Sequence, residues 1–137
     1  MALSIKLSDS PLDNDYCLKF INGNQPTGQF IVQAVLTNQS SKSERIEFAS
    51  ENDSFIQMTQ IAQELIRRFR LPRAIIHHRI GSVQPNDALI YLAFAGSDGT
   101  MTFEACDRAI TKICNHNPNW QKQDFEIRQI GLAAQTG

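Results

Sequence analysis

Residues 74–95, A-I-I-H-H-R-I-G-S-V-Q-P-N-D-A-L-I-Y-L-A-F-A, hold the pattern that decides the fold. Residues 74–81 and 88–95 are segments of strand length, and the Gln-Pro-Asn-Asp segment at 84–87 consists of turn-forming residues. Two strands joined by so short a turn are expected to form an antiparallel hairpin. The second run is apolar throughout, which predicts a strand that needs cover on both of its faces.

One amphipathic helix is predicted before this hairpin in the chain and one after it, because apolar residues recur there at three- and four-residue steps. Asp53 or Ser54 is expected to cap the first helix, and Thr100 or Thr102 the second. Leu71-Pro72 and Asn117-Pro118 are expected to end them. The predicted buried faces are Phe55, Met58, Ile61, Ala62, Leu65, Ile66 and Phe69 in the first helix, and Phe103, Cys106, Ala109, Ile110, Ile113 and Cys114 in the second.

The remaining segments complete an alternating order of strands and helices. Residues 3–7 and 124–130 predict the first and last strands, and Ser10-Pro11 opens a helix that runs to Phe20. Residues 28–37 and 45–49 predict two strands that a polar loop joins into a hairpin. The order β-α-β-β-α-β-β-α-β favours an α+β fold with a mostly antiparallel sheet, formed by one domain over residues 1–137.

Composition excludes several classes of partner and location. The 137 residues carry 13 basic and 14 acidic side chains, so no strong field exists to attract nucleic acid. No apolar stretch approaches the ~20 residues that cross a bilayer, and the first residues do not resemble a signal peptide. Three cysteines without a C-x-x-C pair indicate reduced, buried thiols. We therefore expect a cytoplasmic protein that binds neither membrane nor nucleic acid.

The densest basic cluster is His77-His78-Arg79. Side chains alternate along a strand, so His77 and Arg79 should share one face while His78 points to the other. These two histidines cannot then bind one metal ion, and we predict no metal site and no cofactor. The expectation is that one imidazole is buried and hydrogen-bonded, and that Arg79 pairs with a carboxylate or an anion. Residues 96–100, Gly-Ser-Asp-Gly-Thr, lack the Lys-Ser/Thr ending of a P-loop and are interpreted as a turn with a helix cap.

An ordered set of segments carries a family resemblance. The segments, in chain order, are residues 28–37, residues 45–49, His78-Arg79-Ile80-Gly81, Asn86-Asp87, Phe103-Glu104-Ala105 and Pro118-Asn119-Trp120. Their order and spacing resemble the large subunit of molybdopterin synthase. The resemblance implies an α/β hammerhead-type fold and a homodimer that accepts the Gly-Gly tail of a small ubiquitin-like sulfur carrier. It further implies transfer of thiocarboxylate sulfur to a cyclic pyranopterin phosphate, in the biosynthesis of the molybdenum cofactor.

The positions that the resemblance makes catalytic have changed. Gln121 and Cys114 stand where the family has two lysines, Asp98-Gly99 where it has His-Arg, and Thr37 where it has an arginine. The remaining candidates are Lys122 and Lys112 as catalytic residues and Arg79 as a substrate-binding residue. Two functions stay open: a divergent sulfur-transfer enzyme, or a non-catalytic relative that pairs with the carrier or with a competent large subunit.

Overall fold

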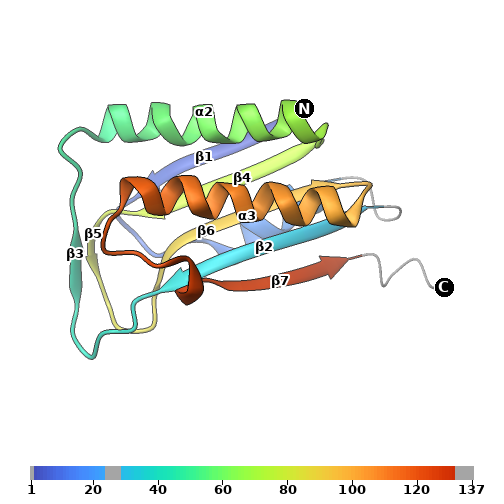
Figure 1. Cartoon of the computed structure of the whole chain (residues 1–137). Helices are drawn as coiled ribbons and strands as arrows, with labels where there is room; N and C mark the ends of the chain where they lie inside the picture. The colour runs from blue at the N-terminus through green and yellow to red at the C-terminus, as the bar shows by residue number, and fades with distance from the viewer. Residues whose placement is uncertain (1, 24–28, 132–137) are drawn as a thin grey trace.

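A five-stranded sheet forms the centre of the computed structural model, which describes residues 2–23 and 29–131 (Figure 1). The strand order is β1 (Ala2–Ser8), β4 (Arg73–Arg79), β6 (Ala88–Gly96), β2 (Phe30–Thr37) and β7 (Glu126–Gly131). β1 and β4 are parallel, and the other neighbouring pairs are antiparallel. The predicted α+β class with a mostly antiparallel sheet is confirmed. Gly28, the predicted start of one strand, lies outside the described residues.

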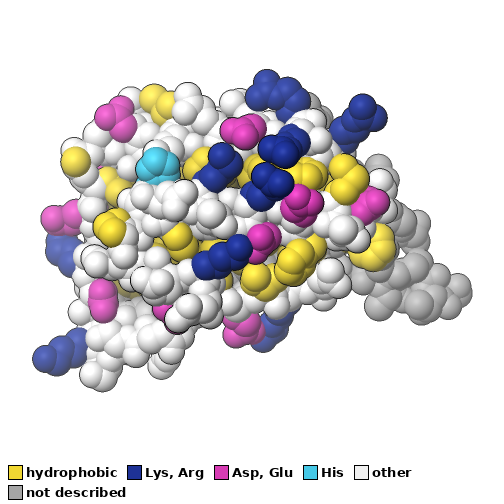
Figure 2. Space-filling view, in the orientation of Figure 1, with side chains coloured by type: hydrophobic (Ala, Val, Ile, Leu, Met, Phe, Trp, Pro, Cys, Tyr) yellow, Lys and Arg dark blue, Asp and Glu magenta, His cyan; other side chains and the backbone are white. Residues whose placement is uncertain are grey.

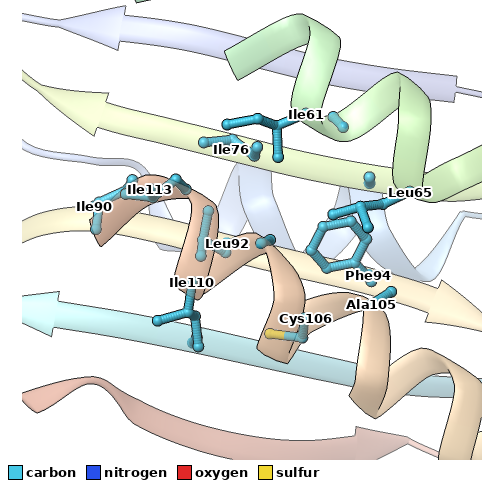
Figure 3. Packing of buried hydrophobic residues seen from close by; sticks show 14 of the residues in the cluster. Ile61, Leu65, Ile76, Ile90, Leu92, Phe94, Ala105, Cys106, Ile110 and Ile113 are labelled. Atoms are coloured by element: carbon cyan, nitrogen blue, oxygen red, sulfur yellow. The ribbon is translucent and has the colours of Figure 1, made fainter. Parts of the chain in front are cut away.

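Helices cover both faces of this sheet. α2 (Glu51–Phe69) and α3 (Gly99–His116) lie side by side on one face, where Leu65 and Ile110 pack above Phe94 and Leu92 of β6 (Figures 1 and 3). α1 (Asn14–Asn22) packs against the opposite face and buries Cys17 and Ile21 there. β6 is buried on both faces, as expected, but helices of its own chain provide the cover. The apolar run of β6 is therefore no argument for a second copy of the chain.

The predicted hairpin between residues 28–37 and 45–49 is wrong. β2 has β6 on one side and β7 on the other, so both of its edges are already hydrogen-bonded. The following segment shortens to β3 (Glu44–Ile46), which pairs with β5 (Gly81–Val83) in a separate two-stranded sheet. Gly81 begins β5 with a φ of +80°, a conformation that favours glycine and ends the straight course of β4.

All three helices begin at residues other than the predicted ones. Ser8 donates from Oγ to the Ser10 carbonyl at 2.7 Å, which makes a turn there and leaves Asp13 as the N-cap of α1. Ser50 caps α2 and Asp98 caps α3, each by accepting a hydrogen bond from the backbone N–H three residues ahead. Serine and aspartate are common capping residues, so neighbouring candidates could not be distinguished by type alone.

Two of the predicted core residues are exposed. Phe55 and Phe103 are each 41% exposed, whereas Met58 and Thr102 begin the buried faces of their helices. Each phenylalanine is the fifth residue of its helix, near the N-terminal end of α2 or α3. No described helix combines the length and apolar character needed to span a bilayer.

Candidate functional site

The family resemblance places catalytic groups in the last turn of α3 and the segment that follows it, and we call residues 114–124 the α3 exit. Consecutive turns build it, with Trp120 N–H donating to the Asn117 carbonyl and Asp124 N–H to the Gln121 carbonyl. Trp120 stacks on His78 of β4 with ring centroids 5.0 Å apart. This contact fixes the α3 exit against the sheet, and it places Lys122 in a short 3₁₀ helix, η1 (Lys122–Asp124).

Lys122 of the α3 exit forms an ion pair with an acidic residue of α3. Its Nζ lies 2.6 Å from Oδ1 of Asp107, which lies on α3 about two helical turns before Cys114. Cys114 is half-buried nearby, where burial raises the pKa of its thiol, Lys122 lowers it and Asp124 raises it. A thiol with a raised pKa stays protonated, so Cys114 cannot supply the positive charge of the lysine that the family has there.

Lys112 points elsewhere. Its Nζ lies 3.8 Å from Oε1 of Glu64 on α2, whereas Lys122 pairs with Asp107. Figure 2 shows basic side chains gathered over this helical face with acidic side chains among them. The two candidate lysines therefore do not share a partner, and each is engaged by its own carboxylate.

Arg79 is buried at the end of β4. Its side chain is 4% exposed, with Nη2 donating to the Ser82 carbonyl at 2.7 Å and Nη1 3.8 Å from Oδ2 of Asp87. Nε and Nη1 are buried and receive no hydrogen-bond partner from the described residues. The expected carboxylate partner is thus present at Asp87, and the contacts of Arg79 lie in the connection between β4 and β6, apart from those of Lys112 and Lys122.

The alternation predicted for the two adjacent histidines is confirmed. Nε2 of His77 lies 2.8 Å from Ser4 Oγ, and Nδ1 lies 3.6 Å from Cys17 Sγ, on the α1 face of the sheet. His78 contacts Trp120 and Phe48 on the opposite side. Both imidazoles are buried, whereas only one was expected to be.

Burial lowers the pKa of both imidazoles to about 4, from an ordinary 6.5. In the unfolded chain they would take up protons near the ordinary value, so between pH 6.5 and 4 the unfolded state binds more protons. We expect the free energy of unfolding to fall as the pH is lowered through that window, and these groups to have no effect above it. Urea unfolding at about pH 7 and about pH 5 measures the slope, ~1.4 kcal/mol per pH unit for each proton. His77→Gln should remove one proton from that slope; an unchanged slope would contradict the assignment.

The Asp98-Gly99 position lies at the other end of α3. Asp98 accepts a hydrogen bond from Met101 N–H at 2.9 Å, and its carbonyl accepts one from Thr102 Oγ1. An open hollow of about 610 Å³ adjoins it, lined in part by Phe30 and Phe103. The carboxylate serves as a helix cap here and gives this hollow a negative rim.

Sequence reasoning missed Asp107 and the Ser4–Cys17–His77 contact. Asp107 and Cys114 are seven residues apart and so lie on the same side of α3. Lys122 lies close to both, and this spacing is the one sequence signal that could have suggested its pairing with Asp107. No local pattern links Ser4 or Cys17 to His77, because the contacts join β1, α1 and β4. No group of three metal-ligating side chains of the His, Cys, Asp or Glu type occurs within residues 2–23 and 29–131.

Comparison with known proteins gives consistent matches. The family model described as MoaE protein matches residues 7–116, so the α3 exit beyond His116 lies outside that match. A molybdopterin synthase catalytic subunit of Caulobacter vibrioides is 29% identical over 124 residues, covering 87% of this chain and 81% of the relative. A protein of the same description from Drosophila pseudoobscura is 26% identical, and the chain spans only 35% of its length.

Solved structures share the fold. The molybdopterin biosynthesis MoaE protein from Burkholderia ambifaria superposes with a TM-score of 0.69 at 18% identity, over 80% of this chain and 74% of that one. A complex of subunits 1 and 2 of molybdopterin-converting factor from Helicobacter pylori gives a TM-score of 0.57 at 13% identity, over 80% and 76% of the two chains. With a family model that matches most of the sequence and a fold that agrees with it, this chain belongs to the MoaE protein family.

Proposed function

We propose that this chain acts in molybdenum cofactor biosynthesis as a molybdopterin synthase large-subunit-like protein, and that it binds a small ubiquitin-like sulfur carrier in the cytoplasm. The observation that carries the proposal is the family match over residues 7–116. A chain in the complex of subunits 1 and 2 of molybdopterin-converting factor from Helicobacter pylori has a similar fold, which supports a second, different subunit as the partner. We further propose that residues 1–137 form one domain that carries this function without a cofactor or a metal.

The position of the replaced residues supports a homodimer. Asp98 and Cys114 lie at opposite ends of α3, and sixteen helical residues at 1.5 Å each separate them by about 24 Å. Groups that far apart on one rigid helix cannot act on the same small substrate within a single chain. If both positions belong to one site, a second copy has to supply one of them. The homodimer that the sequence resemblance implies has this geometric support.

We expect sedimentation equilibrium at micromolar concentration to give about twice the 15.4 kDa mass of the chain. A mass of 15.4 kDa, that of one chain, at every concentration would contradict the dimer. It would leave the fold and the family unaffected, because β6 is already covered within one chain.

Binding of the carrier is tested by gel filtration of the two proteins together. Co-elution with the intact carrier is expected, and a carrier that lacks its terminal Gly-Gly should elute separately. If the intact carrier also elutes alone, the proposed partner is wrong.

A second function is favoured by one specific observation. Cys114 is uncharged at the position of a family lysine, and the nearby Lys122 is paired with Asp107 at 2.6 Å. Such a site can hold a partner without stabilising the anions that form during sulfur transfer. In this alternative the chain is a non-catalytic relative that binds the carrier or a competent large subunit, and only an activity assay separates it from a working enzyme.

A further inference from the structure

A small cavity lies between α2, the C-terminal end of α3 and His78 of β4. Its volume is about 60 Å³, and its polar lining comes from Ser54, Gln57, His78, His116 and Asn117, with the Met58 thioether beside them. The space suits a single ion with one or two water molecules. It belongs to neither the Lys122–Asp107 pair nor the hollow beside Asp98.

His78 lines this cavity and has a ring nitrogen without a hydrogen-bond partner among the described residues. Nδ1 lies 2.7 Å from the Arg79 carbonyl, which can only accept a hydrogen bond, so Nδ1 carries the proton. Nε2 is then the unprotonated nitrogen. It is buried, and none of the described residues donates a hydrogen bond to it. The residue is 2% exposed, so Nε2 is available as an acceptor to a water molecule, an ion or a ligand in the cavity.

His116 provides a second imidazole to the same cavity, from the last turn of α3. The Gln57 side-chain nitrogen lies 3.0 Å from both of its ring nitrogens. An amide N–H needs only one of the two as acceptor, so the other ring nitrogen stays available. His116 is exposed, which gives the cavity an entrance from solvent.

We propose that His78 Nε2 and His116 together bind a divalent transition metal ion of the zinc or nickel class, with water completing the coordination. Imidazole nitrogen is a preferred ligand of these metals. A metal-binding histidine typically donates its other ring N–H to a backbone carbonyl, and the bond from His78 to Arg79 is of this kind. Met58 and Asn117 are close enough to the cavity to contribute a further ligand.

The tautomer of His78 favours this site. The hydrogen bond from Nδ1 to the Arg79 carbonyl leaves Nε2 without a proton, so a metal ion can bind it directly. The adjacent His77 cannot take part, because it points to the α1 face. The pairing joins residues 38 positions apart, which is why the sequence, judged on His77 and His78, predicts no metal site.

The single tryptophan reports on binding directly, since Trp120 stacks on His78 with ring planes 20° apart. Titration of the full chain with Ni²⁺ should quench Trp120 fluorescence saturably at one ion per chain, and added Zn²⁺ should displace Ni²⁺ and restore it. His116 is exposed, so His116→Ala is expected to fold normally and to raise the Kd about tenfold or more. Circular dichroism checks its fold.

Cys114→Ser is the matched control, because it removes the half-buried thiol at the end of the same helix while leaving both imidazoles in place. Its Kd for Ni²⁺ should equal that of the unchanged chain. The proposal is overturned if quenching is not saturable, in which case the cavity holds water only. It is equally overturned if His116→Ala binds as tightly as the parent chain, or if Cys114→Ser abolishes binding.

Discussion

Molybdopterin formation by this chain, supplied with thiocarboxylated carrier and cyclic pyranopterin phosphate, should be at least about a hundredfold slower than by the Caulobacter vibrioides relative. Sulfur transfer passes through anionic species, and the loss of one well-placed stabilising group from such a site lowers the rate by roughly a hundred- to thousandfold. Here several positions have changed together: Thr37, Asp98, Gly99, Cys114 and Gln121. Asp98 adds a negative charge, and Lys122 is already paired with Asp107. Groups that act together are not additive, so we expect a large loss without summing the parts.

One double variant and one single variant test the reason for this expectation. Cys114→Lys combined with Gln121→Lys restores both lysines of the family pattern and should raise the rate by tenfold or more if the rest of the site persists. Turnover by the unchanged chain that equals an ordinary relative, and that Lys122→Ala abolishes, would show instead that Lys122 has taken over catalysis. Quantifying molybdopterin by its oxidised fluorescent product distinguishes these results.

Leu65→Ala should lower the free energy of unfolding by roughly 2–5 kcal/mol. Leu65 is 1% exposed and packs between α2 and the sheet beside Phe94 (Figure 3), so the shortened side chain leaves a cavity that its neighbours fill only partly. Urea unfolding followed by circular dichroism measures the change.

Phe55→Ala is the comparison for Leu65→Ala, because Phe55 lies on the same helix and is 41% exposed. Its effect should be well under that of Leu65→Ala, despite the larger side chain. A loss below about 0.5 kcal/mol for Leu65→Ala would mean that α2 presents a different face to the sheet.

Local patterns predicted most of the elements correctly. The turn-forming residues between β4 and β6 and the three- and four-residue apolar spacing of α2 and α3 are signals that lie within single segments. The pairing of β3 with β5 was not predictable in the same way, because it depends on β7 taking the free edge of β2 nearly a hundred residues later. Phe55 and Phe103 fit the apolar period and are nonetheless exposed, since the period does not show where along a helix its cover begins.

In the candidate site, too, local features were predicted and contacts between distant segments were not. The opposite directions of His77 and His78 were predicted correctly, because strand alternation is a local property. It did not pair Lys122 with Asp107 or Lys112 with Glu64, because these contacts depend on how the α3 exit turns back and how two helices align. It also did not show that Asp98 and Cys114 lie at opposite ends of one helix, because the predicted helix began at Thr100 or Thr102 and Asp98 was assigned to the turn before it.

The place of β1 at the edge of the sheet has a consequence for how the chain folds. Ala2 pairs with Arg73 in a parallel register, so the first strand made has no partner until the fourth has formed. β4 and β6 are close in sequence and can pair early, whereas both edges of the sheet, β1 and β7, are closed by contacts between distant segments. Closing long loops is entropically unfavourable and slows folding. We therefore expect a nucleus around β4 and β6, with the N-terminal strand docking late, and an apolar edge on β4 that is open to intermolecular pairing until it does.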